Sequence, residues 1–66
     1  MDIESTAFYL FVQSFHKGEF EGQRLGQAFY NHFNLHKLSN QEQLLGLYEK
    51  DGEEAKNIIN KVFSFH

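Results

Sequence analysis

The chain has 66 residues, enough for one domain over residues 1–66 with a small hydrophobic core. It contains no cysteine, which excludes disulfides, thiolate metal sites and cysteine nucleophiles. Its net charge of −3 gives no general attraction to nucleic-acid phosphates. No apolar run reaches the roughly 18 residues of a membrane span, so we expect a cytoplasmic protein.

The first predicted helix starts at Asp2 or Ser5, since either side chain can cap it, and ends near Lys17, before Gly18. Its core-facing stripe consists of apolar residues at helical spacing: Phe8, Phe11, Val12 and Phe15. The run "FYLFV" in this helix is also compatible with a buried strand, with "VFSFH" at the end of the sequence as its partner. We favour the helix because no other run alternates with period two.

This first helix has a second apolar side. Ile3, Ala7 and Leu10 follow helical spacing there, and Tyr9 lies off both stripes. Monomers seldom leave a large contiguous apolar patch in water, so another surface should cover these residues. The sequence therefore predicts that Ile3, Tyr9 and Leu10 bind a partner, either a second copy in a homodimer or a different protein. The alternative is a helix that is central to its own domain, with both sides internal.

The segment "KGEFEGQ" predicts a connection in which Phe20 anchors into the core. The second helix should run from about residue 23 to residue 33, and its buried stripe consists of Leu25, Ala28, Phe29, His32 and Phe33. Gly26 weakens this helix by about 1 kcal/mol relative to alanine. An alternative role for Gly26 is to let another helix approach closely.

Ser39 and Glu42 form a capping-box pattern, which predicts the start of a third helix. Gly52 should end that helix, and its inward-facing residues should be Leu44, Leu47 and Tyr48. Asp51 can cap a fourth helix with Glu54 at its third position. The apolar stripe of this last helix consists of Ala55, Ile58, Ile59, Val62 and Phe65. These patterns together predict an all-α fold of about four short helices, as a monomer or a helical homodimer.

His32 and His36 are four residues apart, a spacing that on a helix lets two imidazoles bind one zinc ion. A zinc site needs at least a third ligand, and Phe33 stands where an H-E-x-x-H metalloprotease has its catalytic glutamate. We favour a structural interpretation, with His32 in the buried stripe and His36 near the negative end of the helix dipole. No metal site is predicted.

Residues that could act as nucleophiles stand in no pattern typical of catalysis. The serines and the threonine lack both a strained turn motif and an acid spaced to orient a histidine base. The glycines of "GEFEG" carry two carboxylates between them, which would repel a bound phosphate. We therefore expect neither enzyme activity nor a cofactor.

Four acids gather around the predicted turn before the last helix: Glu49, Asp51, Glu53 and Glu54. They form a second candidate partner-binding surface, because clustered carboxylates can mimic a phosphate backbone and occupy a basic groove. Capping and the helix dipole explain the same acids without any partner. The sequence leaves both interpretations open.

The alternative function is that of a small helix-turn-helix transcriptional regulator. In that interpretation Asn40, Gln41 and Gln43 lead a recognition helix, since their side chains suit adenine edges. Phosphate contacts need basic residues, yet the third predicted helix has only Lys50, with Lys37 near its start. Nucleic acid is therefore the disfavoured partner.

A set of elements lies between residues 23 and 63: Gly26–Gln27 followed by an aromatic helix, then Asn31, then Leu47–Tyr48, and an acidic turn at Asp51–Gly52 before a last helix. In these elements the chain resembles short helical proteins of bacteriophages and prophages. The resemblance implies an accessory factor in the bacterial cytoplasm, often an inhibitor of host defences such as an anti-CRISPR protein. We therefore expect a non-enzymatic protein that binds and modulates a bacterial protein.

Overall fold

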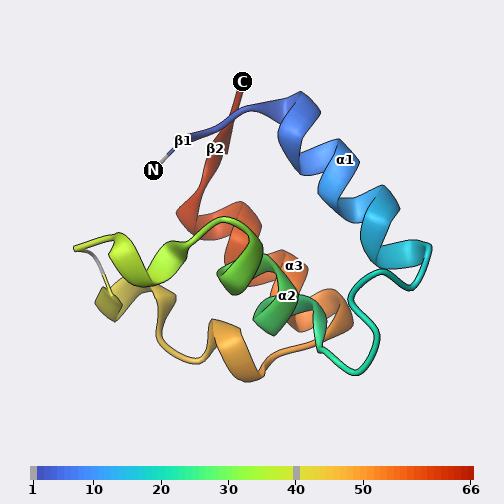
Figure 1. Cartoon of the computed structure of the whole chain (residues 1–66). Coiled ribbons are helices and arrows are strands. Elements are labelled where there is room, and N and C mark those ends of the chain that lie inside the picture. Colours follow the sequence, from blue (N-terminus) through green and yellow to red (C-terminus); the bar gives the residue numbers. More distant parts are fainter. Residues whose placement is uncertain (1, 40) are drawn as a thin grey trace.

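The computed structural model describes residues 2–39 and 41–66. The α-helices in these residues are α1 (Ser5–His16), α2 (Leu25–His32) and α3 (Gly52–Val62) (Figure 1). Short 3-10 helices connect α2 to α3, namely η1 (Leu35–Lys37), η2 (Gln41–Leu44) and η3 (Leu47–Glu49). The strands β1 (Asp2–Ile3) and β2 (Ser64–Phe65) pair in parallel. The predicted all-α class is confirmed, and none of the described helices is long and apolar enough to cross a bilayer.

The first helix follows the predicted periodicity. Phe11 is buried, and the other residues of its stripe pack half-buried against the core, namely Phe8, Val12 and Phe15. α1 begins at Ser5, one of the two predicted starts, and has its C-cap at Lys17, as predicted. The predicted capping side chain is wrong, because the N-cap is Glu4. The strand alternative for "FYLFV" is wrong, because these residues lie in α1, and residues 64–65 pair with β1 instead.

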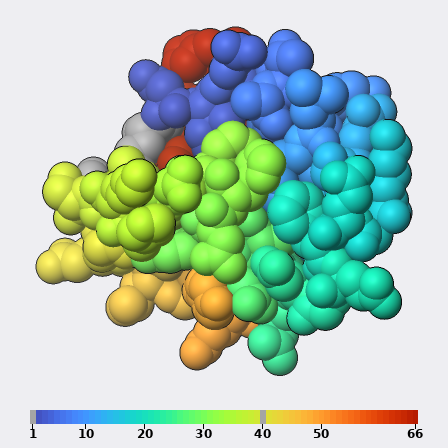
Figure 2. Space-filling view, in the orientation of Figure 1, coloured from blue at the N-terminus to red at the C-terminus, as the bar shows by residue number. Residues whose placement is uncertain are grey.

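The two strands form a terminal strand pair beside the start of α1. Ile3 pairs with Phe65. The Ser5 N–H donates a hydrogen bond to the His66 carbonyl oxygen at 2.7 Å, and the His66 N–H donates to the Ile3 carbonyl oxygen at 3.1 Å. Figure 2 shows the first and last residues of the described chain, in blue and red, together at one edge of the molecule. The Ser5 N–H, which has no acceptor within the first turn of α1, thus bonds to a residue far away in the sequence.

The core is aromatic, and its four most deeply buried large side chains come from four different elements: Phe11, Phe29, Leu47 and Ile59. The ring centroid of Phe29 lies 5.6 Å from that of Phe11 and 5.5 Å from that of Phe63, both edge to face. This geometry is favoured between aromatic rings. Phe20 lies 5.3 Å from Phe11, which confirms its predicted role as a core anchor.

Gly26 is the point of closest approach between α2 and the segment around η3. Its N–H donates a hydrogen bond to the Lys50 carbonyl oxygen at 3.0 Å. A side-chain carbon at Gly26 would collide with the Leu47 carbonyl oxygen and would lie 2.8 Å from that of Lys50. The close approach predicted at Gly26 is confirmed, although its neighbour is a 3-10 helix.

The α-helix predicted to start at Ser39 is not formed. Its residues form η2 and η3 instead, separated by Gly46 at a φ of +84°. This left-handed conformation interrupts α-helical hydrogen bonding. Asn40 lies outside the described residues. The local capping pattern is outweighed because the backbone of η3 packs against Gly26.

The side chains of this region follow the prediction in part. Leu44 and Leu47 are buried as predicted, whereas Tyr48 is 42% exposed. Gly52 begins α3 and does not end a helix, and Asp51 is the N-cap of α3, as predicted. Of the predicted last stripe, the structure buries Ala55 and Ile59 and half-buries Ile58 and Val62. The predicted extension of this stripe to Phe65 is wrong, because α3 ends at Val62 and Phe65 lies in β2.

Candidate functional site

The outer side of α1 carries two large apolar side chains that contact solvent. Leu10 is 55% exposed and Tyr9 is 60% exposed. Leu10 also lines a shallow hollow, together with Ala7, Phe11, Ser14 and His32. We use the name Leu10 face for the exposed and half-buried residues on this side of α1: Thr6, Ala7, Tyr9, Leu10, Gln13 and Ser14. It includes Ala7, Tyr9 and Leu10, three of the four residues of the second apolar surface that the sequence predicted.

Ile3 does not belong to the Leu10 face. It lies in β1, before α1, and is 8% exposed as part of the core. Its predicted place on the second side of the first helix is therefore wrong. The physical reason is that the chain is extended at Ile3, where pairing with β2 turns its side chain inward. Partner binding by Tyr9 and Leu10 stays a prediction.

The Leu10 face has an apolar centre and a neutral polar border, and charged residues stand just beyond the two ends of α1. The Tyr9 hydroxyl accepts a hydrogen bond from Gln13 Nε2 at 2.8 Å. Glu4 at the start of α1 and Lys17 at its end are both exposed. An apolar centre inside a polar border is the usual anatomy of a protein–protein interface. The start of α1 thus has a negative charge beside it and its end a positive one.

Asp51 joins the starts of two helices. Its Oδ1 atom accepts hydrogen bonds from the N–H of Leu25, at the start of α2, and from the N–H of Gly52, at the start of α3, both at 2.9 Å. These bonds, that from Leu25 first, hold the pKa of Asp51 below its ordinary value of 3.8. The cap on the last helix was predicted, whereas the bond to α2 was not.

The remaining acids of the second candidate surface lie close to Asp51 in the sequence. Glu54 forms an ion pair with Lys50, with 3.1 Å between Oε2 and Nζ. Glu49 and Glu53 are exposed, like the other two acids. Two of the four carboxylates thus have partners within the chain. Binding of a partner by this surface stays a prediction, and capping accounts for Asp51 directly.

The two histidines of the spacing motif lie in different elements. His32 ends α2 and is exposed, so its predicted place in the buried stripe is wrong. One side of its ring still covers the core, with centroids 5.2 Å from Phe11 and 4.8 Å from Phe33. His36 lies in η1, beyond the end of α2. Among the described residues, no three histidines or acids are placed to hold a metal ion.

Gln41, which the alternative function placed in a recognition helix, bonds to the protein itself. Its Nε2 atom donates to the carbonyl oxygens of Leu35 at 2.8 Å and Leu38 at 2.7 Å. Its Oε1 atom accepts from the Tyr30 hydroxyl at 2.7 Å. Because residues 41–44 form η2, the predicted recognition helix is wrong.

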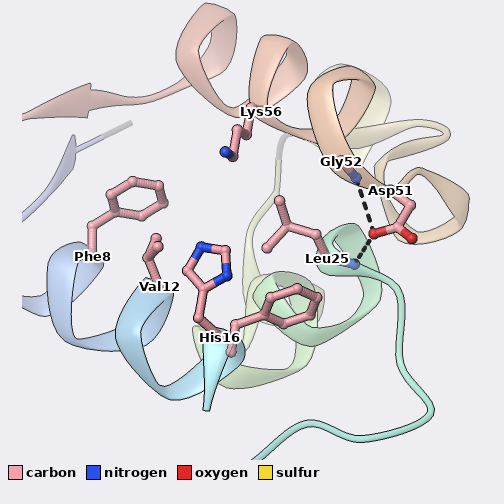
Figure 3. A pocket seen from close by; sticks show the side chains of 8 residues that line it. Phe8, Val12, His16, Leu25, Asp51, Gly52 and Lys56 are labelled. Carbon is pink, nitrogen blue, oxygen red and sulfur yellow. Dashed lines mark hydrogen bonds between the residues drawn. The ribbon is translucent and has the colours of Figure 1, made fainter. Parts of the chain in front are cut away.

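A small apolar pocket lies between α1 and α3 (Figure 3). Its volume is about 100 Å³. We call it the α1–α3 pocket; it is lined by Phe8, Val12, Phe15, His16, Leu25, Asp51, Gly52 and Lys56. Sequence reasoning assigned its phenylalanines and valine to the core and missed the pocket. No local pattern signals it, because the pocket is a gap between residues from three different helices.

No protein-family model matches this chain, and no curated protein or solved structure matches it at a significant level.

Proposed function

We propose that this protein is a non-enzymatic binding protein that contacts another protein through the Leu10 face. The observation that carries the proposal is the exposure of Leu10 beside a hollow, on a helix whose opposite side is packed in the core. Apolar burial contributes roughly 25 cal/mol per Å². Tyrosine is also enriched among the residues that dominate interface energies, so Tyr9 adds to this surface.

A second copy of the chain fits the Leu10 face in an antiparallel orientation. With both copies of Leu10 at a twofold axis, the Glu4 end of each helix lies beside the Lys17 end of the other. A parallel arrangement would bring like charges together, which disfavours it. The small side chains of Ala7 and Ser14 flank Leu10 and permit close helix packing.

The size of the Leu10 face sets the expected strength of this dimer. α1 has 12 residues and is therefore about 18 Å long. One helix face of this length covers less than the roughly 800 Å² per partner that is typical of a stable interface. We therefore expect a weak dimer that dissociates on dilution.

The test is the solution mass by light scattering behind a sizing column, from millimolar to low micromolar concentration. We expect the wild-type mass to fall from dimer toward monomer across this range. Leu10→Asp should be monomeric throughout, because it places a charge on the twofold axis. The matched control is Leu45→Asp, since Leu45 is 83% exposed and lies on another segment. Both variants should keep the circular dichroism of the wild type.

Three outcomes would contradict self-association through this face. The first is a wild-type chain that is monomeric at millimolar concentration. The second is a dimer that Leu45→Asp weakens as much as Leu10→Asp does. The third is unfolding of Leu10→Asp, which would mean that Leu10 is internal.

The resemblance to phage accessory proteins supports a bacterial host protein, such as part of a defence complex, as the modulated target. The Leu10 face would act by covering a surface of that protein. Immobilised wild-type chain and Leu45→Asp should then retain the same protein from a bacterial lysate, and Leu10→Asp should lose it. Retention by all three would place the target on another surface, with Glu49 and Glu53 the next residues to substitute.

A further inference from the structure

The α1–α3 pocket lies on the core side of α1, away from the exposed Leu10 and Tyr9. Figure 3 shows Phe8 and Val12 on one side of it and Leu25 on the other. Together with Phe15, these side chains give the pocket apolar walls. An apolar pocket with few polar groups is the usual form of a small-molecule site.

Two basic side chains reach this apolar space from opposite sides. His16 comes from the last turn of α1, and Lys56 comes from α3 (Figure 3). Neither forms an ion pair or a side-chain hydrogen bond within residues 2–39 and 41–66. The lining of the pocket thus includes an ammonium group and an imidazole, both on solvent-exposed residues and both without a side-chain hydrogen-bond partner in the described part of the chain.

The carboxylate that lines the pocket does not neutralise these groups. Asp51 Oδ1 accepts hydrogen bonds from the backbone N–H groups of Leu25 and Gly52. In Figure 3 the carboxylate lies on the far side of Leu25 from His16. Among the described residues, Lys56 and His16 therefore form no ion pair with the carboxylate that lines the same pocket.

We propose that the α1–α3 pocket binds a small monocarboxylate with an apolar body. The carboxylate accepts hydrogen bonds from Lys56 Nζ and the His16 ring, and the apolar body contacts Phe8 and Val12. The volume of about 100 Å³ is below the roughly 300 Å³ of common ligand sites, which limits the ligand to one ring or a short chain. This site is independent of the proposed binding of a protein through the Leu10 face.

Benzoate is the probe, and benzyl alcohol is its neutral control because it has nearly the same shape. Each is titrated into the ¹⁵N-labelled chain, and amide chemical shifts are followed. We expect saturable shifts at residues 12–16 and 52–56. Benzoate should bind about fivefold more tightly than benzyl alcohol, as expected for one solvent-accessible ion pair.

Variants test which side chains give this preference for a carboxylate. In Lys56→Gln, benzoate affinity should fall to that of benzyl alcohol, and His16→Gln should also weaken benzoate. Lys61→Gln is the matched control, since Lys61 is an exposed cation of α3 that does not line the pocket. It should bind benzoate within about twofold of wild type, because a distant exposed charge contributes little.

The proposal is overturned if benzoate gives no saturable shift, or if its shifts lie away from these residues. It is also overturned if benzoate and benzyl alcohol bind the wild type equally, or if Lys61→Gln weakens benzoate as much as Lys56→Gln does. Leu10→Asp should bind benzoate like the wild type. A loss of self-association therefore cannot be mistaken for a loss of this site.

Discussion

Asp51 shows how one side chain can set the position of two helices. Its Oδ1 atom accepts the N–H groups of Leu25 and Gly52, the first residues of α2 and α3. N–H groups in the first turn of a helix have no partner within that helix. A negative charge is also favoured at the positive end of each helix dipole. Because the same bonds lower the pKa of Asp51, its protonation is coupled to folding.

The variant Asp51→Asn keeps an oxygen that can accept both bonds and removes the charge. We expect it to unfold at lower urea concentration than the wild type at neutral pH, and Asp51→Ala at lower concentration still. The pKa of Asp51 is lower in the folded chain than its ordinary value of 3.8, so the charge stabilises the fold fully above that value. This contribution is lost as the pH falls through the lowered pKa. The difference between wild type and Asp51→Asn should therefore vanish in acid.

Urea unfolding at a series of pH values measures this difference. Glu53→Gln is the control, because it neutralises an exposed acid in the same first turn of α3. It should change the urea midpoint less than Asp51→Asn does. An advantage of wild type over Asp51→Asn that persists unchanged in acid would contradict the role of the carboxylate charge.

At the scale of elements, the contact between α2 and η3 decides the form of the segment between α2 and α3. The backbones meet at Gly26, whose N–H donates to the Lys50 carbonyl oxygen. Gln27 Nε2 adds a hydrogen bond to the Tyr48 hydroxyl at 3.0 Å. This bond links the partly exposed Tyr48 side chain to α2. Residues 47–50 are therefore fixed by partners far away in the sequence.

The substitution Gly26→Ala tests this contact, because the contact decides whether alanine raises or lowers the free energy of unfolding. In an ordinary helix interior, replacing glycine with alanine stabilises by about 1 kcal/mol. Here the added carbon collides with the Leu47 carbonyl oxygen, and both partners are backbone atoms that cannot rotate away. We expect a net loss of about 2 kcal/mol in the free energy of unfolding, measured in urea.

The control for Gly26→Ala is Asn31→Ala, an exposed position of α2 where alanine should be slightly stabilising. Finding Gly26→Ala as stable as the wild type, or more stable, would show that α2 and η3 are not in backbone contact.

For the whole molecule, a structural feature can be predicted from the sequence when the residues that determine it are close together in the chain. The three α-helices were predictable because their signal is their own apolar periodicity, and the exposure of Leu10 follows from the same period. The Asp51 cap lies beside the helix that it caps. These features need only a few neighbouring residues, which a local pattern contains.

Several features that depend on distant partners were missed. Ile3 faces the core because it pairs with Phe65, at the other end of the described chain. In the segment after Ser39, the backbone at Leu47 and Lys50 packs on Gly26. The α1–α3 pocket exists only where three helices come together. In each case the deciding residues are distant in sequence, and no local propensity encodes their contact.

The terminal strand pair joins residues from the two ends of the described chain, and its apolar residues are Ile3 and Phe65. The Phe65 ring centroid lies 4.7 Å from that of Phe8 in α1. The side chains of Asp2 and His66 also meet, with 3.1 Å between Oδ1 and Nε2, and both are exposed to solvent. Exposed ion pairs contribute little. Packing of Phe65 should therefore hold the two ends together.

Phe65→Ala is expected to lower the free energy of unfolding by about 2 kcal/mol, roughly half the usual effect of removing a fully buried phenylalanine. It should also speed hydrogen exchange of the Ser5 amide, whose acceptor is the His66 carbonyl oxygen. Asp2→Asn removes the charge from the exposed contact with His66 and should cost less than about 0.5 kcal/mol, with Ser5 still protected. Two results would show that aromatic packing does not hold the two ends together. One is a Ser5 amide that exchanges as slowly in Phe65→Ala as in the wild type, and the other is Ser5 exchange that Asp2→Asn speeds as much as Phe65→Ala does.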